Sequence, residues 1–263
     1  MSVIHLQSTD LVLAASLVLI NAVASMVLRL RLHRQVLWAA ARMVVQLLLV
    51  GLVLRIVFGA SSATATLAII GVMILAAARE VAVRPQQRLK GGGNYRIGAL
   101  VVALSSVSTV ALALVTAIRP EPWYDPRYAI PLMGIVLGTV LNAASLGLDS
   151  FFGEVVASRA AIEAQLALGA TSREALAALV RSSIRRGMIP IINQMSAAGV
   201  ITLPGIMTGQ LLAGMDPVES AKYQILLLFL LTGAGGLAAA GAVFLAARSI
   251  TDERHRLRTD RWK

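Results

Sequence analysis

The chain consists largely of apolar runs of about twenty residues, separated by short basic connections. A run of this length crosses the ~30 Å hydrocarbon core of a bilayer when it forms an α-helix. Backbone N–H and C=O groups in lipid must be satisfied within the protein, so such runs predict helices rather than open sheets. Because 57% of the residues are hydrophobic and only 14% are charged, an ordinary soluble domain is excluded. The sequence therefore predicts an all-α, polytopic membrane protein.

Seven apolar segments are predicted to cross the membrane, and the third of them is the shortest. They are residues 11–28, 37–58, 64–78, 97–118, 130–148, 188–212 and 223–247. With this count, twenty cationic residues fall on one side of the membrane and only four on the other. The positive-inside rule then places the N-terminus outside and the C-terminus in the cytoplasm. We interpret residues 1–263 as a single transmembrane domain that ends in a basic tail, 248–263, which contacts anionic lipid.

Several classes of chemistry are excluded by the residues that the chain lacks. It has no cysteine, so it has neither a disulfide nor a thiolate site. Its three histidines, His5, His33 and His255, do not have the spacing of metal ligands. No nucleophile, histidine and carboxylate are grouped as catalysis requires. We therefore predict that the chain is not an enzyme and binds no metal or cofactor. The net charge of +11 lies mainly between the spans, which does not indicate nucleic-acid binding.

The connection between the fifth and sixth predicted spans, 153–187, is too polar to cross a membrane and too regular for a loop. It predicts one helix over 154–168, which Gly169 ends, and a second that Thr171 begins, with Glu174 as its capping-box partner. The second helix carries an apolar stripe of Leu176, Leu179, Val180 and Ile184. A DNA-reading helix-turn-helix is disfavoured because spans tether both of its ends. Two interpretations remain: an amphipathic hairpin on the membrane surface, and a cytoplasmic hairpin that docks on a separate motor subunit.

Several stretches resemble known transport proteins. The stretch "EAQLALG" (163–169) resembles the E-A-A-x-x-x-G loop of ABC-importer permeases, which docks on the ATPase, although Gln165 departs from that pattern. Longer stretches resemble the FetB-type permeases, a family that is implicated in iron export and related to plant aluminium-tolerance permeases. They are "RMVVQLLLVGLVL" (42–54), "LNAASLGLD" (141–149), "LALGATSREAL" (166–176) and "SSIRRGMIPIINQMSAAGVITLPGIMTGQLLAGMDPVESAKYQI" (182–225).

This resemblance implies a permease subunit of the bacterial inner membrane that works with a separate cytoplasmic ABC ATPase, two copies of each. The partner would bind ATP, and this chain would bind no cofactor. The residues predicted to couple to the ATPase are Glu163, Gly169, Thr171, Arg173 and Glu174. The transport activity that the resemblance implies is metal export, with iron as the metal. The alternative is a standalone ion-coupled secondary transporter, although such carriers usually have an ionisable residue deep within a span.

Polar residues within the predicted spans are candidates for a substrate pathway, because polar groups are costly in lipid. They are Arg42 and Gln46 in the second span, Asn142 in the fifth, and Asn193 and Gln194 in the sixth. Two other interpretations stay open. The Arg42 side chain can extend to the headgroups, and the amides can form hydrogen bonds between helices.

The stretch "VITLPGIMTGQLLAGMDP" interrupts the sixth predicted span. Pro204 removes a backbone hydrogen bond and its ring clashes with the preceding turn, so a kink or break is expected just before it. Gly205 allows another helix to approach closely, and Thr208 and Gln210 supply polar atoms. We predict that this broken span lines the substrate route and moves during transport. A static proline kink is the alternative.

Overall fold

The structure, a computed structural model, describes residues 7–60, 62–85, 87, 92–252, 254 and 256–258. The elements formed by these residues are all helices, which confirms the predicted all-α class. The chain divides into two compact units: unit 1 is Met1–Ser61 and unit 2 is Ser62–Lys263.

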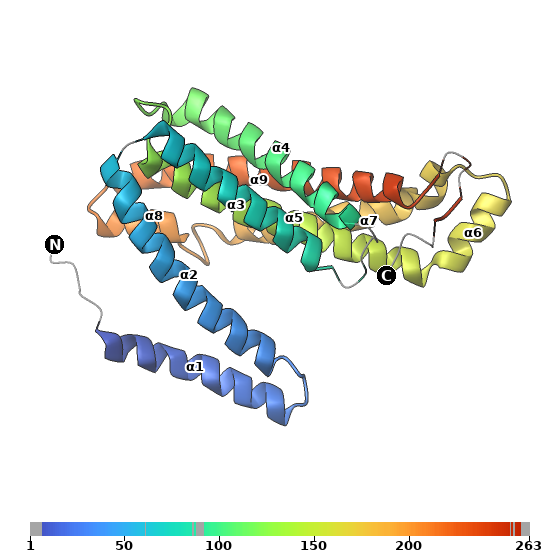
Figure 1. Ribbon diagram of the computed structural model, residues 1–263, viewed down its shortest axis with the longest axis horizontal. Coiled ribbons are helices and arrows are strands. Elements are labelled where there is room, and N and C mark those ends of the chain that lie inside the picture. Colours follow the sequence, from blue (N-terminus) through green and yellow to red (C-terminus); the bar gives the residue numbers. More distant parts are fainter. Residues whose placement is uncertain are drawn as a thin grey trace. The chain divides into compact units, whose positions relative to one another are not determined.

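Unit 1 is a pair of helices, α1 (Ser8–Val27) and α2 (His33–Ala60), which contact each other and are joined by a short connection (Figure 1). Two arginines in the connection, Arg29 at φ 55° and Arg31 at φ 58°, adopt the left-handed conformation. This conformation turns the chain sharply between the two helices. Most side chains of both helices are apolar and exposed, as expected for helices that contact lipid tails.

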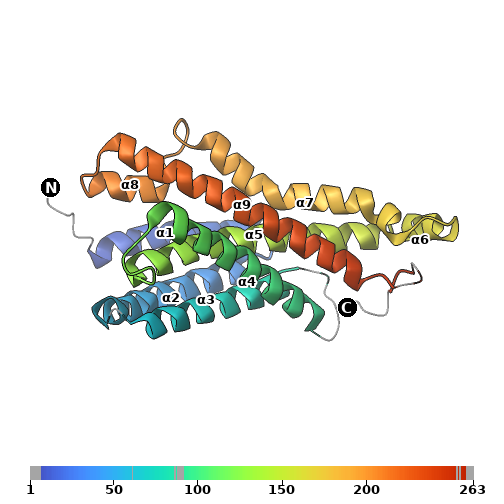
Figure 2. The same ribbon diagram turned by 90° about the horizontal axis from the view of Figure 1, so that it is seen from above.

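Unit 2 contains the remaining helices. They are α3 (Ala63–Val83), α4 (Gly93–Ala113) with its π-helical continuation η2 (Leu114–Ile118), α5 (Pro126–Ala157), α6 (Arg159–Ala167), α7 (Ser172–Ala197), α8 (Gly205–Leu212) and α9 (Pro217–Ser249). Helix α5 is central in this unit, because it packs against α3, α4, α7 and α9 (Figures 1 and 2). Its buried face carries valine, alanine and leucine side chains.

Small residues let α5, α7 and α9 approach one another closely. A Cβ atom added to Gly187 of α7 would lie 2.7 Å from the carbonyl oxygen of Ala143 and 3.0 Å from the Cβ of Ala239. Glycine and alanine at such positions allow helix backbones to approach, which is how helices associate in lipid. This contact fixes the position of α7 against the centre of the unit.

Six helices within the described residues are long and apolar enough to cross a membrane: α1, α2, α3, α4 with η2, α5 and α9. Six of the seven predicted segments correspond to these helices, with ends that differ by at most nine residues, which confirms a multi-pass membrane protein. The exception is the predicted sixth segment, 188–212, which is divided between α7 and α8.

The division of this segment confirms the predicted interruption but changes its cause. Helix α7 ends at Ala197, well before Pro204, and Pro204 instead precedes the first residue of α8. The intervening Gly199 has φ +85°, a conformation that L side chains rarely adopt. Its N–H donates to the carbonyl oxygen of Thr202 at 2.9 Å. The left-handed turn at Gly199 therefore ends α7, and the Val200 side chain beyond it is 92% exposed.

Most of the described basic residues of unit 2 gather at one end of it. This end is formed by the last turns of α3, α5 and α9, the first turns of α4 and α7, and all of α6 (Figures 1 and 2). Its described arginines include Arg84, Arg96, Arg159, Arg173, Arg181, Arg185, Arg186, Arg248 and Arg256. We call it the basic end. Arg88 and Lys90, also assigned to this side by the charge pattern, lie outside the described residues, as do residues 253, 255 and 259–263 of the predicted basic tail.

The described part of the basic tail folds back on itself after α9. Thr251 bridges to Leu257, and the backbone N–H of Arg256 donates to the Asp252 carboxylate at 2.8 Å. The guanidinium of Arg256 pairs with the same carboxylate at 2.9 Å. The hydrogen bond from the Arg256 backbone is the main reason that the pKa of Asp252 lies below its ordinary value.

Candidate functional site

Helices α6 and α7 form a hairpin at the basic end, but the predicted continuous helix over 154–168 is wrong. Helix α5 ends at Ala157, and Ser158, at φ −102° and ψ 15°, separates it from α6. Beyond the bend, the Ile162 side chain is buried in the same hydrophobic core as Leu176 of α7. Long-range packing of this side chain therefore outweighs the local preference for one uninterrupted helix.

The predicted start of the second hairpin helix is confirmed. The Thr171 N–H donates to Glu174 Oε2 at 2.8 Å, and the Glu174 N–H donates to Thr171 Oγ1 at 3.3 Å. This capping box satisfies two N–H groups that the helix leaves free. Gly169 has φ +95° in the turn before it. The shape of the hairpin thus depends on Gly169, Thr171 and Glu174. A contact of these residues with a partner would be a second role beside this structural one.

The hairpin exposes small residues, one large apolar side chain and several polar ones, including Glu163, Gln165 and Arg159. We define this tip surface by its exposed residues Glu163, Ala164, Ala167, Leu168 and Gly169. Leu168 is 89% exposed, and Glu163 accepts a hydrogen bond from Arg159 Nε at 2.8 Å. The tip surface therefore offers one exposed apolar side chain and one charged side chain.

A group of polar residues that the sequence analysis did not identify connects the hairpin to α5. Arg186 of α7 pairs with Glu154 of α5 at 2.8 Å, and Ser182 Oγ donates to Glu154 at 2.6 Å. Arg186 also donates to Ser150 Oγ at 3.1 Å. We call these four residues the polar clamp. It holds the middle of α7 against α5.

Two of the predicted pathway residues, Asn142 and Gln194, line the same small hollow between α5 and α7. It has a volume of about 50 Å³, and the Thr139 side chain also contributes to it. Arg84, at the end of α3, donates from Nη1 to Asn142 Oδ1 at 3.0 Å. We call Thr139, Asn142 and Gln194 the polar hollow. Asn142 and Gln194 are exposed, although both lie within predicted spans. Asn193 is exposed on α7 but does not line the hollow.

The other predicted pathway residues lie elsewhere. Arg42 and Gln46 are exposed on α2 of unit 1. Pro204 is the N-cap of α8 and Gly205 its first residue, and Thr208 Oγ1 of α8 donates to the Pro204 carbonyl oxygen at 3.2 Å. Gln210 is also on α8, and its Oε1 is inaccessible and has no hydrogen-bond partner among the described residues.

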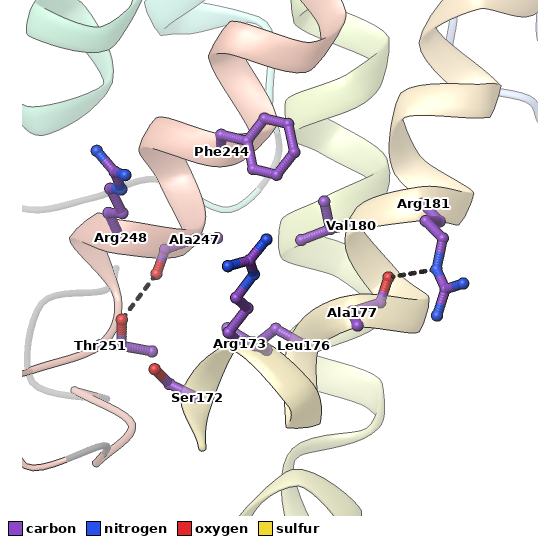
Figure 3. Close-up of a pocket in the computed structure, with 10 residues that line it drawn as sticks. All are labelled: Ser172, Arg173, Leu176, Ala177, Val180, Arg181, Phe244, Ala247, Arg248 and Thr251. Carbon is purple, nitrogen blue, oxygen red and sulfur yellow. Dashed lines mark hydrogen bonds between the residues drawn. The ribbon is translucent and has the colours of Figure 1, made fainter. Parts of the chain in front are cut away.

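Arg173, predicted to contact the ATPase, lines a cavity of about 500 Å³ between the start of α7 and the end of α9 (Figure 3). Arg181 and Arg248 also line this cavity, which we call the arginine pocket. Its walls include apolar side chains of both helices. As for metal sites, no group of three or more histidine, aspartate and glutamate side chains that could hold an ion occurs within the described part of the chain.

Comparison with known proteins supports the resemblance found in the sequence. Residues 8–251 match the Uncharacterised protein family (UPF0014). "UPF0014 membrane protein slr1647" of Synechocystis is 39% identical over 204 residues, 77% of each chain. "Probable iron export permease protein FetB" of Escherichia coli is 30% identical over 253 residues, 96% of this chain and 95% of its own. "Protein ALUMINUM SENSITIVE 3" of Arabidopsis thaliana is 26% identical over 251 residues, 94% of this chain and 88% of its own. No solved structure matches.

Proposed function

Because the chain belongs to the uncharacterised protein family UPF0014, we propose that it is a membrane permease, the membrane-spanning subunit of an ABC transporter. A separate cytoplasmic ATPase supplies the energy, and two copies of each subunit form the transporter. The observation that carries this proposal is the continuous helix α7, whose 26 residues extend from the tip surface to the interruption at Gly199. At 1.5 Å per residue, its length is about 39 Å.

The proposed topology has seven crossings, with the N-terminus outside and the C-terminus in the cytoplasm. The sixth crossing is made by the second half of α7 together with the broken segment that includes α8. The gathering of arginines at the basic end supports a cytoplasmic location for that end, because cytoplasmic connections carry an excess of arginine and lysine. The hairpin of α6 and α7 then faces the cytoplasm, where an ATPase can reach it.

In the proposed coupling, the tip surface docks on the ATPase and α7 conveys its movement to the membrane. Leu168 provides an apolar contact and Glu163 a charged one, while Gly169 keeps the turn compact. The polar clamp makes α5 move with the middle of α7. The segment between α7 and α8 forms no regular helix and is held to α7 by the N–H groups of Ile201 and Thr202, which both donate to the Ala197 carbonyl oxygen at 3.0 Å. In the proposed coupling, this short segment changes its conformation when α7 moves.

We propose iron as the exported substrate, since "Probable iron export permease protein FetB" is similar along nearly the whole chain. The polar hollow supplies amide and hydroxyl oxygen atoms, which suit transient contacts with a hydrated or chelated ion. Asn142 and Gln194 are exposed at the depth of the predicted spans. A face of this kind avoids lipid in a dimer in which two copies enclose the pathway.

The first prediction concerns the tip surface. Replacing Leu168 by aspartate will weaken assembly with the ATPase by about 2 kcal/mol or more, roughly thirtyfold in affinity, because it puts a charge into the apolar contact. Folding will be unaffected, since the Leu168 side chain is 89% exposed. The measurement is co-purification of the co-expressed ATPase, followed by ATP-driven iron flux in proteoliposomes.

The matched control is Ala178→Asp, which adds the same charge to an exposed position of α7 outside the tip surface. It should leave assembly and flux unchanged. Undiminished recruitment and coupling in Leu168→Asp would count against the ABC assignment. Iron flux that persists without any ATPase would instead identify a secondary transporter.

The second prediction concerns the interruption after α7. Replacing Gly199 by valine will reduce transport several-fold, because a left-handed conformation costs a residue with a Cβ atom about 1–2 kcal/mol. The measurement is flux at matched protein levels, with Gly209→Ala as the control, since a Cβ there meets nothing within 4 Å. If Gly199→Val and Pro204→Ala both transport normally, the interruption is a static feature and does not act as a hinge.

A further inference from the structure

We propose that the arginine pocket binds the phosphate group of an anionic phospholipid at the membrane surface. The pocket lies where the apolar part of α9 ends, between the exposed Phe244 and the first residues after the helix. Lipid phosphates are found at this depth, just beyond the hydrocarbon core. The proposal depends on the membrane location of the chain and not on its coupling to an ATPase.

The charges in the pocket favour an anion. Arg173 and Arg248 come from different helices, and neither side chain forms an ion pair or hydrogen bond with the residues that the structure describes. None of the side chains lining the pocket is a carboxylate. Two described acids adjoin the pocket in sequence, and both have partners. Asp252 is paired with Arg256 at 2.9 Å, and Glu174 accepts a hydrogen bond from the Thr171 N–H at 2.8 Å. In Figure 3 the Arg248 side chain extends away from Arg173, so the two arginines line the pocket from different sides. A phosphate bound there gives these cations an anionic partner, because guanidinium groups bind its oxygen atoms in pairs.

The shape and lining of the pocket favour a lipid over free phosphate. In Figure 3 the Arg173 side chain extends between α7 and α9, with Phe244 close by, whereas Arg181 turns away and donates to the Ala177 carbonyl oxygen at 3.2 Å. Leu176 and Val180 form the apolar wall on the side of α7. The volume of about 500 Å³ falls in the roughly 300–1,000 Å³ range of sites for whole small molecules. A headgroup with the first part of its acyl chains matches this combination of charge and apolar surface.

The test uses the full chain in nanodiscs of phosphatidylcholine, into which phosphatidylglycerol is titrated while bound lipid is followed by native mass spectrometry. We expect the wild type to prefer phosphatidylglycerol. Arg173→Gln and Arg248→Gln should each weaken its binding about fivefold, the effect of one arginine near an anionic surface. The control, Arg185→Gln, removes an equally exposed charge from α7 outside the pocket, and it should bind normally.

A second variant separates a lipid from free phosphate. Phe244→Ala leaves all the arginines in place, so it should weaken the binding of phosphatidylglycerol but not the binding of inorganic phosphate. Equal losses in all the arginine variants, Arg185→Gln included, would overturn the proposal, because the effect would then be a general one of charge. The proposal would also be overturned if excess inorganic phosphate displaced the lipid and Phe244→Ala did not change the binding of phosphatidylglycerol. If Arg173→Gln and Arg248→Gln retain the lipid but lose a co-expressed ATPase, the pocket is a protein contact and the proposal fails.

Discussion

Replacing Gly187 by alanine will destabilise unit 2 by about 1–3 kcal/mol, because the added methyl group overfills a closely packed contact. Its Cβ would lie 2.7 Å from the Ala143 carbonyl oxygen and 3.0 Å from the Cβ of Ala239. The first of these is a backbone atom of a central helix, so α7 itself must shift away from α5. The measurement is thermal unfolding of the detergent-solubilised chain, followed by size-exclusion chromatography.

The same shift should impair transport, because Gly187 lies beside the polar hollow. The matched control is Gly153→Ala on α5, where an added Cβ meets nothing within 4 Å. Alanine has the higher helix propensity, so this control should be neutral or stabilising by up to about 1 kcal/mol. If Gly187→Ala melts at the temperature of the wild type, the close contact of α5 with α7 is not an important source of stability.

The features that the sequence predicted correctly depend on residues close together in the chain. The apolar runs that form α1 to α5 and α9 are recognisable because a helix needs about twenty apolar residues to cross a bilayer. The capping box of Thr171 and Glu174 involves residues only three apart. The stripe that contains Leu176 and Val180 follows the helical period, and both side chains are buried.

The features that the sequence did not predict depend on contacts between distant residues. Arg84 and Asn142 are separated by 58 positions, and Ser150 and Arg186 by 36. Residue types alone do not indicate which pairs will meet, because that depends on how the helices pack. The bend at Ser158 was missed for the same reason, since it is the burial of Ile162 that favours it. The candidate site was therefore predicted as separate polar residues, and the fold determines which of them lie together.

Disrupting the polar clamp will uncouple transport from ATP hydrolysis. In Glu154→Ala, Arg186 loses its partner at 2.8 Å and Ser182 loses its acceptor at 2.6 Å. The loss of stability will be small, because the Arg186 side chain is 57% exposed and an ion pair near the surface contributes about 0.2–1 kcal/mol. The loss of coupling will be larger: transport per ATP hydrolysed should fall on the order of tenfold, within the range of coupling free energies of about 1–3 kcal/mol.

The physical reason is that the tip surface stays intact while α5 no longer follows α7. The ATPase should therefore still co-purify and hydrolyse ATP, and only the flux into proteoliposomes should fall. The control is Glu219→Ala, which breaks the 2.7 Å ion pair between Glu219 and Lys222. Both residues of this pair lie in α9, so the pair does not link one helix to another. Exchanging the charges in the double variant Glu154→Arg, Arg186→Glu should restore part of the coupling. Normal flux in Glu154→Ala, or an equal loss in Glu219→Ala, would show that the polar clamp does not transmit movement.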